Sequence, residues 1–76
     1  MMDYQIIKDL IVTHLQLYAT HKKFVYVAQQ CLEWYNNPPE LIKRLKTQLN
    51  ALYSPRVRRE VLDLLTDLEQ MTEYCK

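Results

Sequence analysis

The amino-acid sequence predicts an all-α fold, a small up-down antiparallel bundle of helices that forms a single domain over residues 1–76. Three observations support this prediction. Apolar residues recur three and four positions apart, which is the spacing of helices with one buried face. The chain has no glycine, which β-hairpins and phosphate-binding loops commonly use. Its prolines stand where helices can begin.

The first half of the chain, residues 3–36, contains neither glycine nor proline and carries two apolar stripes. Asp3 and Thr20 are candidate N-caps for helices over about 3–19 and 21–36. The first stripe comprises Ile7, Leu10, Ile11, His14, Leu17 and Tyr18, and the second comprises Phe24, Val27, Ala28, Cys31, Leu32 and Tyr35.

These two stripes nearly continue each other through His21, so one helix over 3–36, and hence three helices in all, stays an alternative. A lone helix of about thirty residues would be about 45 Å long, and the two later helices would leave one end of it uncovered. Packing therefore favours a turn. The β-branched and aromatic residues of "KKFVYVA" also allow a strand, but no turn chemistry is present to pair it.

The third predicted helix spans about 39–53 and follows a double proline. A residue before proline is pushed out of the α region, so we expect Pro38 to be extended and Pro39 to open the helix. Glu40 then lies in the first turn, where its charge complements the helix dipole. The apolar positions that follow are Leu41, Leu45, Leu49 and Leu52.

The fourth predicted helix spans about 55–74. Ser54 can cap it with its hydroxyl, and Pro55 suits the first helical position, which needs no amide donor. Its apolar stripe has the alternating steps of a coiled-coil seam, and Leu62, Leu65 and Tyr74 widen it. The stripe comprises Val57, Val61, Leu64, Leu68, Met71 and Cys75.

The histidines, cysteines and acidic residues do not have the spacing of a catalytic or metal-binding site. His14 and His21 are seven positions apart, whereas two ligands on one helix need a spacing near four. Cys31 lies on an apolar stripe and is interpreted as a small buried residue. Asp63 and Asp67 are expected on a solvated outer face. We therefore expect a non-enzymatic protein with no catalytic residues, no metal site and no cofactor.

The basic residues between 43 and 59 have two interpretations: they bind a partner, or they are paired within the bundle or solvated. Arg56, Arg58 and Arg59 occupy the first turn of the last predicted helix, where cations oppose the helix dipole, and Glu60 relieves this only in part. An acidic partner would compensate for them. Residues 43–46 of the preceding helix should lie about two turns away, so the cations do not form one patch.

Surplus aromatic residues also have two interpretations: they cover the ends of the bundle with their polar tips in water, or they bind a partner, since Tyr, Trp and Arg are enriched at interface hot spots. The sequence therefore predicts a small protein–protein interaction module, such as an adaptor, chaperone or inhibitor. Its partner is another protein or a second copy of the chain in a homo-oligomer. The alternative is a nucleic-acid-binding regulator, although a net charge of +1 is low for that class. The candidate partner-binding residues are Tyr26, Trp34, Lys43, Arg44, Tyr53, Arg56, Arg58 and Arg59.

No run of 18 apolar residues is present, and the first residues, "MMDYQIIKDL", lack the apolar region of a signal peptide. Two cysteines are too few for a disulfide framework. We therefore expect a cytoplasmic protein that does not contact a membrane.

Overall fold

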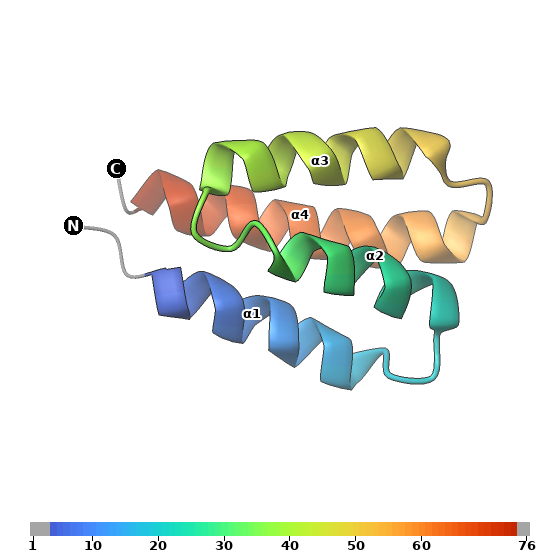
Figure 1. Cartoon of the computed structure of the whole chain (residues 1–76). Coiled ribbons are helices and arrows are strands. Elements are labelled where there is room, and N and C mark those ends of the chain that lie inside the picture. Colours follow the sequence, from blue (N-terminus) through green and yellow to red (C-terminus); the bar gives the residue numbers. More distant parts are fainter. Residues whose placement is uncertain (1–3, 75–76) are drawn as a thin grey trace.

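The computed structural model describes residues 4–74, and the side chains of residues 4–72. Figure 1 shows four helices in which each successive helix runs antiparallel to the one before it. This architecture confirms the predicted all-α bundle, and the described residues contain no strand. The helices are α1 (Tyr4–Leu17), α2 (Lys22–Leu32), α3 (Pro38–Ala51) and α4 (Pro55–Tyr74).

Helices that follow each other in the chain pack side by side, and α1 also packs against α4, which closes the bundle. Within this ring α2 and α4 contact each other across the middle, so α1 and α3 lie on opposite sides. The bundle measures 36 × 22 × 18 Å. Helix α4 is the longest, with 20 residues, and both α2 and α4 pack against all three of the other helices.

A turn separates α1 from α2, so the three-helix alternative is wrong, and so is the strand considered for residues 22–28. The amide of His21 donates to the carbonyl of Tyr18 at 2.9 Å, and the Tyr18 ring lies 5.6 Å from the His21 ring and 5.0 Å from the Phe24 ring. This ring cluster holds the turn. Thr20 is not the cap: His21 occupies that position and makes no side-chain capping bond. Asp3 lies outside the described residues.

The connection from α2 to α3 differs from the prediction at both ends. Helix α2 ends at Leu32, before the expected residue 36, and turns over residues 33–36 lead out of it. Helix α3 begins at Pro38 and not at Pro39, with Asn37 before it. Both prolines fit because the first helical amides have no intrahelical acceptor, so neither ring removes a hydrogen bond.

Helix α4 begins as the sequence predicts. The Val57 amide donates to the Ser54 hydroxyl oxygen at 3.5 Å, and the Arg58 amide donates to the Ser54 carbonyl at 3.0 Å. Pro55 is the first helical residue. This cap places the three arginines that follow at the start of α4, which is the end next to α3 and the α1–α2 turn.

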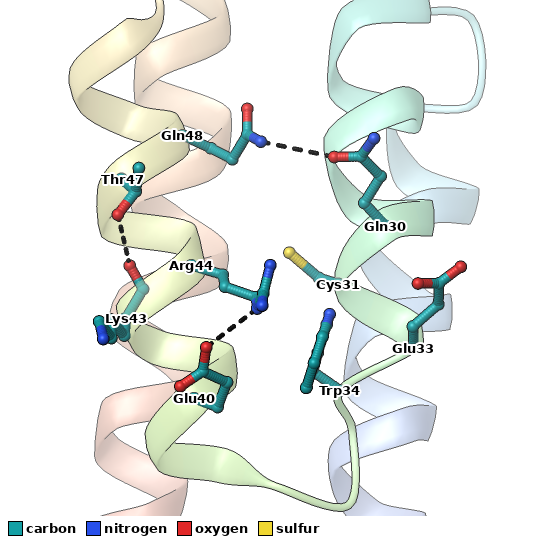
Figure 2. A pocket seen from close by; sticks show the side chains of 9 residues that line it. All are labelled: Gln30, Cys31, Glu33, Trp34, Glu40, Lys43, Arg44, Thr47 and Gln48. Atoms are coloured by element: carbon teal, nitrogen blue, oxygen red, sulfur yellow. Dashed lines mark hydrogen bonds and ion pairs between the residues drawn. The ribbon is translucent and has the colours of Figure 1, made fainter.

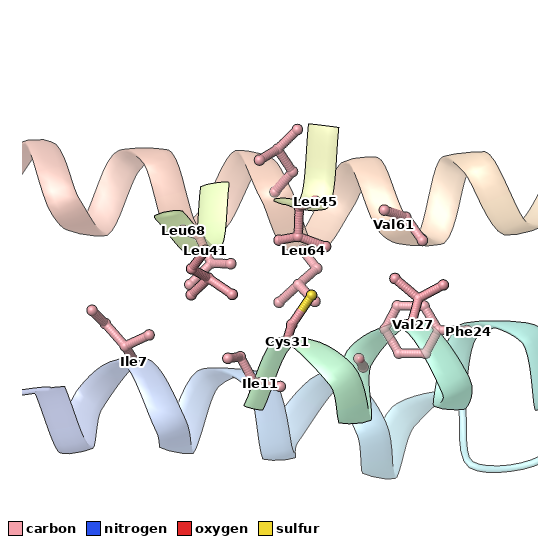
Figure 3. Close-up of a cluster of buried hydrophobic side chains, with 12 residues drawn as sticks. Ile7, Ile11, Phe24, Val27, Cys31, Leu41, Leu45, Val61, Leu64 and Leu68 are labelled. Carbon is pink, nitrogen blue, oxygen red and sulfur yellow. The ribbon is translucent and has the colours of Figure 1, made fainter. Parts of the chain in front are cut away.

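The core is a single cluster of buried side chains contributed by all four helices (Figure 3). The predicted stripes supply it, and Cys31 is buried as expected. Two predicted core residues are instead exposed: Leu17 lies at the end of α1 and is 68% exposed, and Leu62 lies off the buried seam of α4 and is 48% exposed. The buried hydrophobic residues of this cluster are Ile7, Ile11, Phe24, Val27, Ala28, Cys31, Leu41, Leu45, Val61, Leu64, Leu65 and Leu68.

Candidate interaction surfaces

A groove of about 560 Å³ runs between α2 and α3 (Figure 2). Trp34, which follows α2, and Arg44 of α3 meet in it, with the guanidinium carbon 4.0 Å from the centre of the indole ring. The Arg44 Nε atom donates to Oε1 of Glu40 at 3.1 Å. The guanidinium is thus held by a cation–π contact and an ion pair. Lys43 lines the same groove without an ion pair in the described part of the chain.

Polar and buried groups complete this α2–α3 groove. The Gln48 Nε2 atom donates to Oε1 of Gln30 at 3.4 Å and links the two helices. Cys31 also lines the groove, and burial raises the pKa of its thiol to about 11, although the Arg44 charge acts in the opposite direction. A thiol with this pKa stays protonated at neutral pH and is a poor nucleophile.

A second surface, which we call the α3–α4 corner, lies where α3 leads into α4. It is an open depression of about 410 Å³. Tyr53 is 98% exposed here, and Leu62 beside it is 48% exposed. Among the described residues, neither Arg58 nor Arg59 has an ion-pair partner. The corner comprises Leu49, Tyr53, Pro55, Arg58, Arg59 and Leu62.

Arg56 belongs to a different environment, on the side of α4 that meets the α1–α2 turn. Its Nη2 atom lies 2.8 Å from Nε2 of His21, and Nδ1 of His21 lies 2.7 Å from Oε1 of Glu60. Because a guanidinium only donates, Nε2 of His21 accepts, and the imidazole proton is on Nδ1 and is donated to the carboxylate. Arg56 therefore has partners within its own chain, although its side chain is 74% exposed.

Sequence reasoning missed this network of His21, Arg56 and Glu60. It also placed Asp67 on a purely solvated face, whereas an oxygen of Asp67 accepts from Nε2 of His14 at 3.0 Å. The Asp67 side chain is 48% exposed, so its carboxylate contacts both solvent and the buried imidazole of His14. The available signal was that both histidines fall on or beside the apolar stripe of the first half, where an imidazole needs a polar partner.

The structure divides the eight predicted partner-binding residues into separate groups. Trp34, Lys43 and Arg44 meet in the α2–α3 groove, and Tyr53, Arg58 and Arg59 meet at the α3–α4 corner. Arg56 is in the histidine network. Tyr26 is 60% exposed on α2 and lines neither surface. The expected separation of the cations at 43–46 from those at 56–59 agrees with this arrangement.

Over the described part of the chain, no group of three His, Cys, Asp or Glu residues is placed to hold a metal ion. Within the same residues, no helix combines the length and the apolar character needed to cross a membrane. No protein-family model matches the sequence, and no curated protein and no solved structure shows significant similarity to it.

Proposed function

We propose that this protein is a small non-enzymatic interaction module and that the α3–α4 corner is the surface that binds its protein partner. One observation carries the proposal: Tyr53 is 98% exposed, next to a half-exposed leucine and two arginines that have no ion-pair partner in the described residues. Tyrosine and arginine are the residues enriched at interface hot spots, where they become buried on binding.

The chemistry of the corner describes the partner. Apolar contact area is offered by Leu49, Tyr53 and Leu62. The guanidinium groups of Arg58 and Arg59 can each bind a carboxylate through two parallel hydrogen bonds. The complementary surface would carry an apolar side chain flanked by Asp or Glu. An adaptor, a chaperone or an inhibitor would each use such a surface. We expect the module to act in the cytoplasm, where the buried Cys31 thiol would stay reduced.

A nucleic-acid-binding regulator is the second candidate, and the cations Lys43, Arg58 and Arg59, which have no ion pair in the described residues, support it. Two other cations count against it. Arg44 pairs with Glu40, and Arg56 contacts His21 and lies 3.9 Å from Glu60, so their charge is partly neutralised. Nucleic-acid binding would depend steeply on salt because it releases counterions, which makes the two candidates separable.

Site-specific photo-crosslinking tests the proposal. The photoreactive residue p-benzoylphenylalanine is placed at Tyr53 or, as the matched control, at Tyr26, which is also an exposed tyrosine but lies outside the corner. We expect a discrete protein adduct from position 53 in source cells, which is absent from position 26 and lost with Arg58→Glu/Arg59→Glu. The same adducts from both positions, or none from position 53, would refute the corner as the binding surface.

The nucleic-acid candidate is tested in parallel by fluorescence anisotropy with labelled duplex and single-stranded DNA and RNA. Binding that weakens steeply as salt rises, and that requires Arg58 and Arg59, would favour this candidate over a protein partner. Under the proposed function we expect no such binding at physiological salt.

A further inference from the structure

The charges of α4 are segregated along its length. Arg56, Arg58 and Arg59 lie among its first five residues, Glu60 follows but is buried against His21, and the exposed acids Asp63, Asp67 and Glu69 lie in its middle and second half. This order opposes the helix dipole, which favours acids at the N-terminus and cations at the C-terminus. Of these arginines, Arg56 alone forms an ion pair within the described residues. Arg58 and Arg59 therefore oppose the dipole of α4 without an ion pair in the described residues.

The outward face of α4 carries a second seam of regularly spaced residues. Arg59, Leu62, Thr66 and Glu69 follow one another at steps of three, four and three, and all four are exposed. This is the spacing at which one helix packs against another. The buried seam of the same helix, which includes Val61, Leu64 and Leu68, is already covered by the bundle. The outward seam is basic at one end, acidic at the other and apolar between them at Leu62.

We propose that the partner of the α3–α4 corner is a second copy of this chain, bound through an antiparallel α4–α4 contact. The inference rests on the proposed function and names its partner. In an antiparallel pair related by a two-fold axis, the basic start of each α4 lies against the acidic half of the other, and every contact is made twice. The helix dipoles then also oppose each other favourably.

One register satisfies the exposed groups together. Where Arg59 lies opposite the partner's Glu69, Leu62 lies opposite the partner's Thr66 near the two-fold axis. Tyr53 precedes α4 and extends the contact at each end. Glu69 already lies 3.6 Å from Lys46 of its own chain, but both side chains are about half exposed, and such surface pairs contribute little. Replacing the Lys46–Glu69 pair by an intermolecular pair therefore costs little free energy.

The test is a charge-exchange experiment read by sedimentation velocity and light scattering from micromolar to millimolar concentrations. Arg58→Glu/Arg59→Glu places acids opposite acids in a homodimer, and Asp63→Lys/Glu69→Lys places cations opposite cations. We expect each variant to self-associate about tenfold or more weakly than the unmodified chain. Mixing the two variants should restore a dimer that contains one copy of each.

The control variant Lys8→Glu/Lys23→Glu makes the same net charge change as the arginine variant, at exposed sites on α1 and α2. We expect it to dimerise like the unmodified chain, and far-UV circular dichroism confirms that each variant is folded. A dimer that survives both charge reversals would use another face and would overturn the inference. A chain that stays monomeric at every concentration would also overturn it.

The crosslinking result then separates the two proposals. A monomeric chain whose position 53 still gives a discrete adduct to a different protein leaves the corner as a binding surface and rejects only the second copy. A monomeric chain with no adduct at position 53 rejects both. An adduct with twice the mass of the chain supports both.

Discussion

The Nδ1 atom of His21, in the turn between α1 and α2, lies 2.7 Å from Oε1 and 2.8 Å from Oε2 of Glu60 in α4. Glu60 is 5% exposed, so its carboxylate depends on this contact and on the nearby Arg56 for polar partners. The contact joins residues 39 positions apart and ties the α1–α2 turn to the first turns of α4. The turn is thus held by a buried charged hydrogen bond as well as by ring packing.

We expect His21→Ala and Glu60→Ala each to lower the free energy of unfolding by about 1–3 kcal/mol, because each leaves a partly buried polar group without its partner. The double variant should lose at least about 0.5 kcal/mol less than the sum, since the two groups interact directly. Urea denaturation measures this cycle. Lys22→Ala, at an exposed neighbouring position, is the control and should be nearly neutral. Strict additivity would show that the contact does not form.

Replacing His14 with leucine should not destabilise the bundle and should raise its stability by up to about 1 kcal/mol. His14 is 8% exposed, and its Nδ1 atom is buried with no hydrogen-bond partner among the residues that the structure describes, so the substitution removes an unsatisfied group. Asp67, which loses its partner, is half exposed and can be hydrated. Thermal and urea denaturation measure the effect. A loss of more than about 1 kcal/mol would mean that Nδ1 has a partner in solution.

Leu68→Asp should unfold the domain, because it buries a charge at a position that is 0% exposed, at a cost of several kcal/mol in a small protein of limited stability. Leu49→Asp should be milder, since Leu49 is only partly buried. Leu62→Asp, the same change at an exposed position of α4, is the matched control and should keep the helical signal. Circular dichroism during heating measures all three. An unaltered melt for Leu68→Asp would contradict the core.

The Cys31 thiol should make stability fall at alkaline pH. Burial raises its pKa in the folded chain to about 11 from an ordinary value of 9.0, so the unfolded chain loses this proton first. The contribution of Cys31 is complete below pH 9 and is lost as pH rises from 9 to 11. Cys31→Ala, made in a Cys75→Ser background, removes this pH-dependent part of the free energy of unfolding, which amounts to on the order of 2 kcal/mol between pH 9 and pH 11.

Urea denaturation at several pH values compares the two proteins, which differ only at residue 31. The advantage of the cysteine protein over Cys31→Ala should shrink with rising pH. A constant difference from pH 9 to pH 11 would show that the thiol is not held protonated by the fold.

The sequence predicted best those elements whose signals are local. Ser54 and Pro55 mark the start of α4 correctly because a cap is made by neighbouring residues. The end of α1 carries no such signal, since neither glycine nor proline interrupts residues 3–36, and the turn depends on packing around Tyr18. Leu17 and Leu62 matched the helical spacing, but a helix end and an uncovered face leave them exposed.

The candidate surfaces show the same division. The kinds of residue that could bind a partner were evident from composition and from the arginines at a helix start. Which of them lie together was not: Tyr53, Arg58 and Arg59 share the α3–α4 corner, whereas Arg56 is engaged by His21 and Glu60. These contacts join residues that are remote in the chain, or depend on which side of α4 is covered.

The sequence by itself determined that this chain forms helices and which face of each is apolar, because helical periodicity and capping act over a few neighbouring residues. Only the tertiary structure decided where the first half of the chain turns and which arginines have partners within the described residues. Those outcomes depend on how the helices pack, and the partners of a side chain across a bundle are set by the relative placement of whole helices.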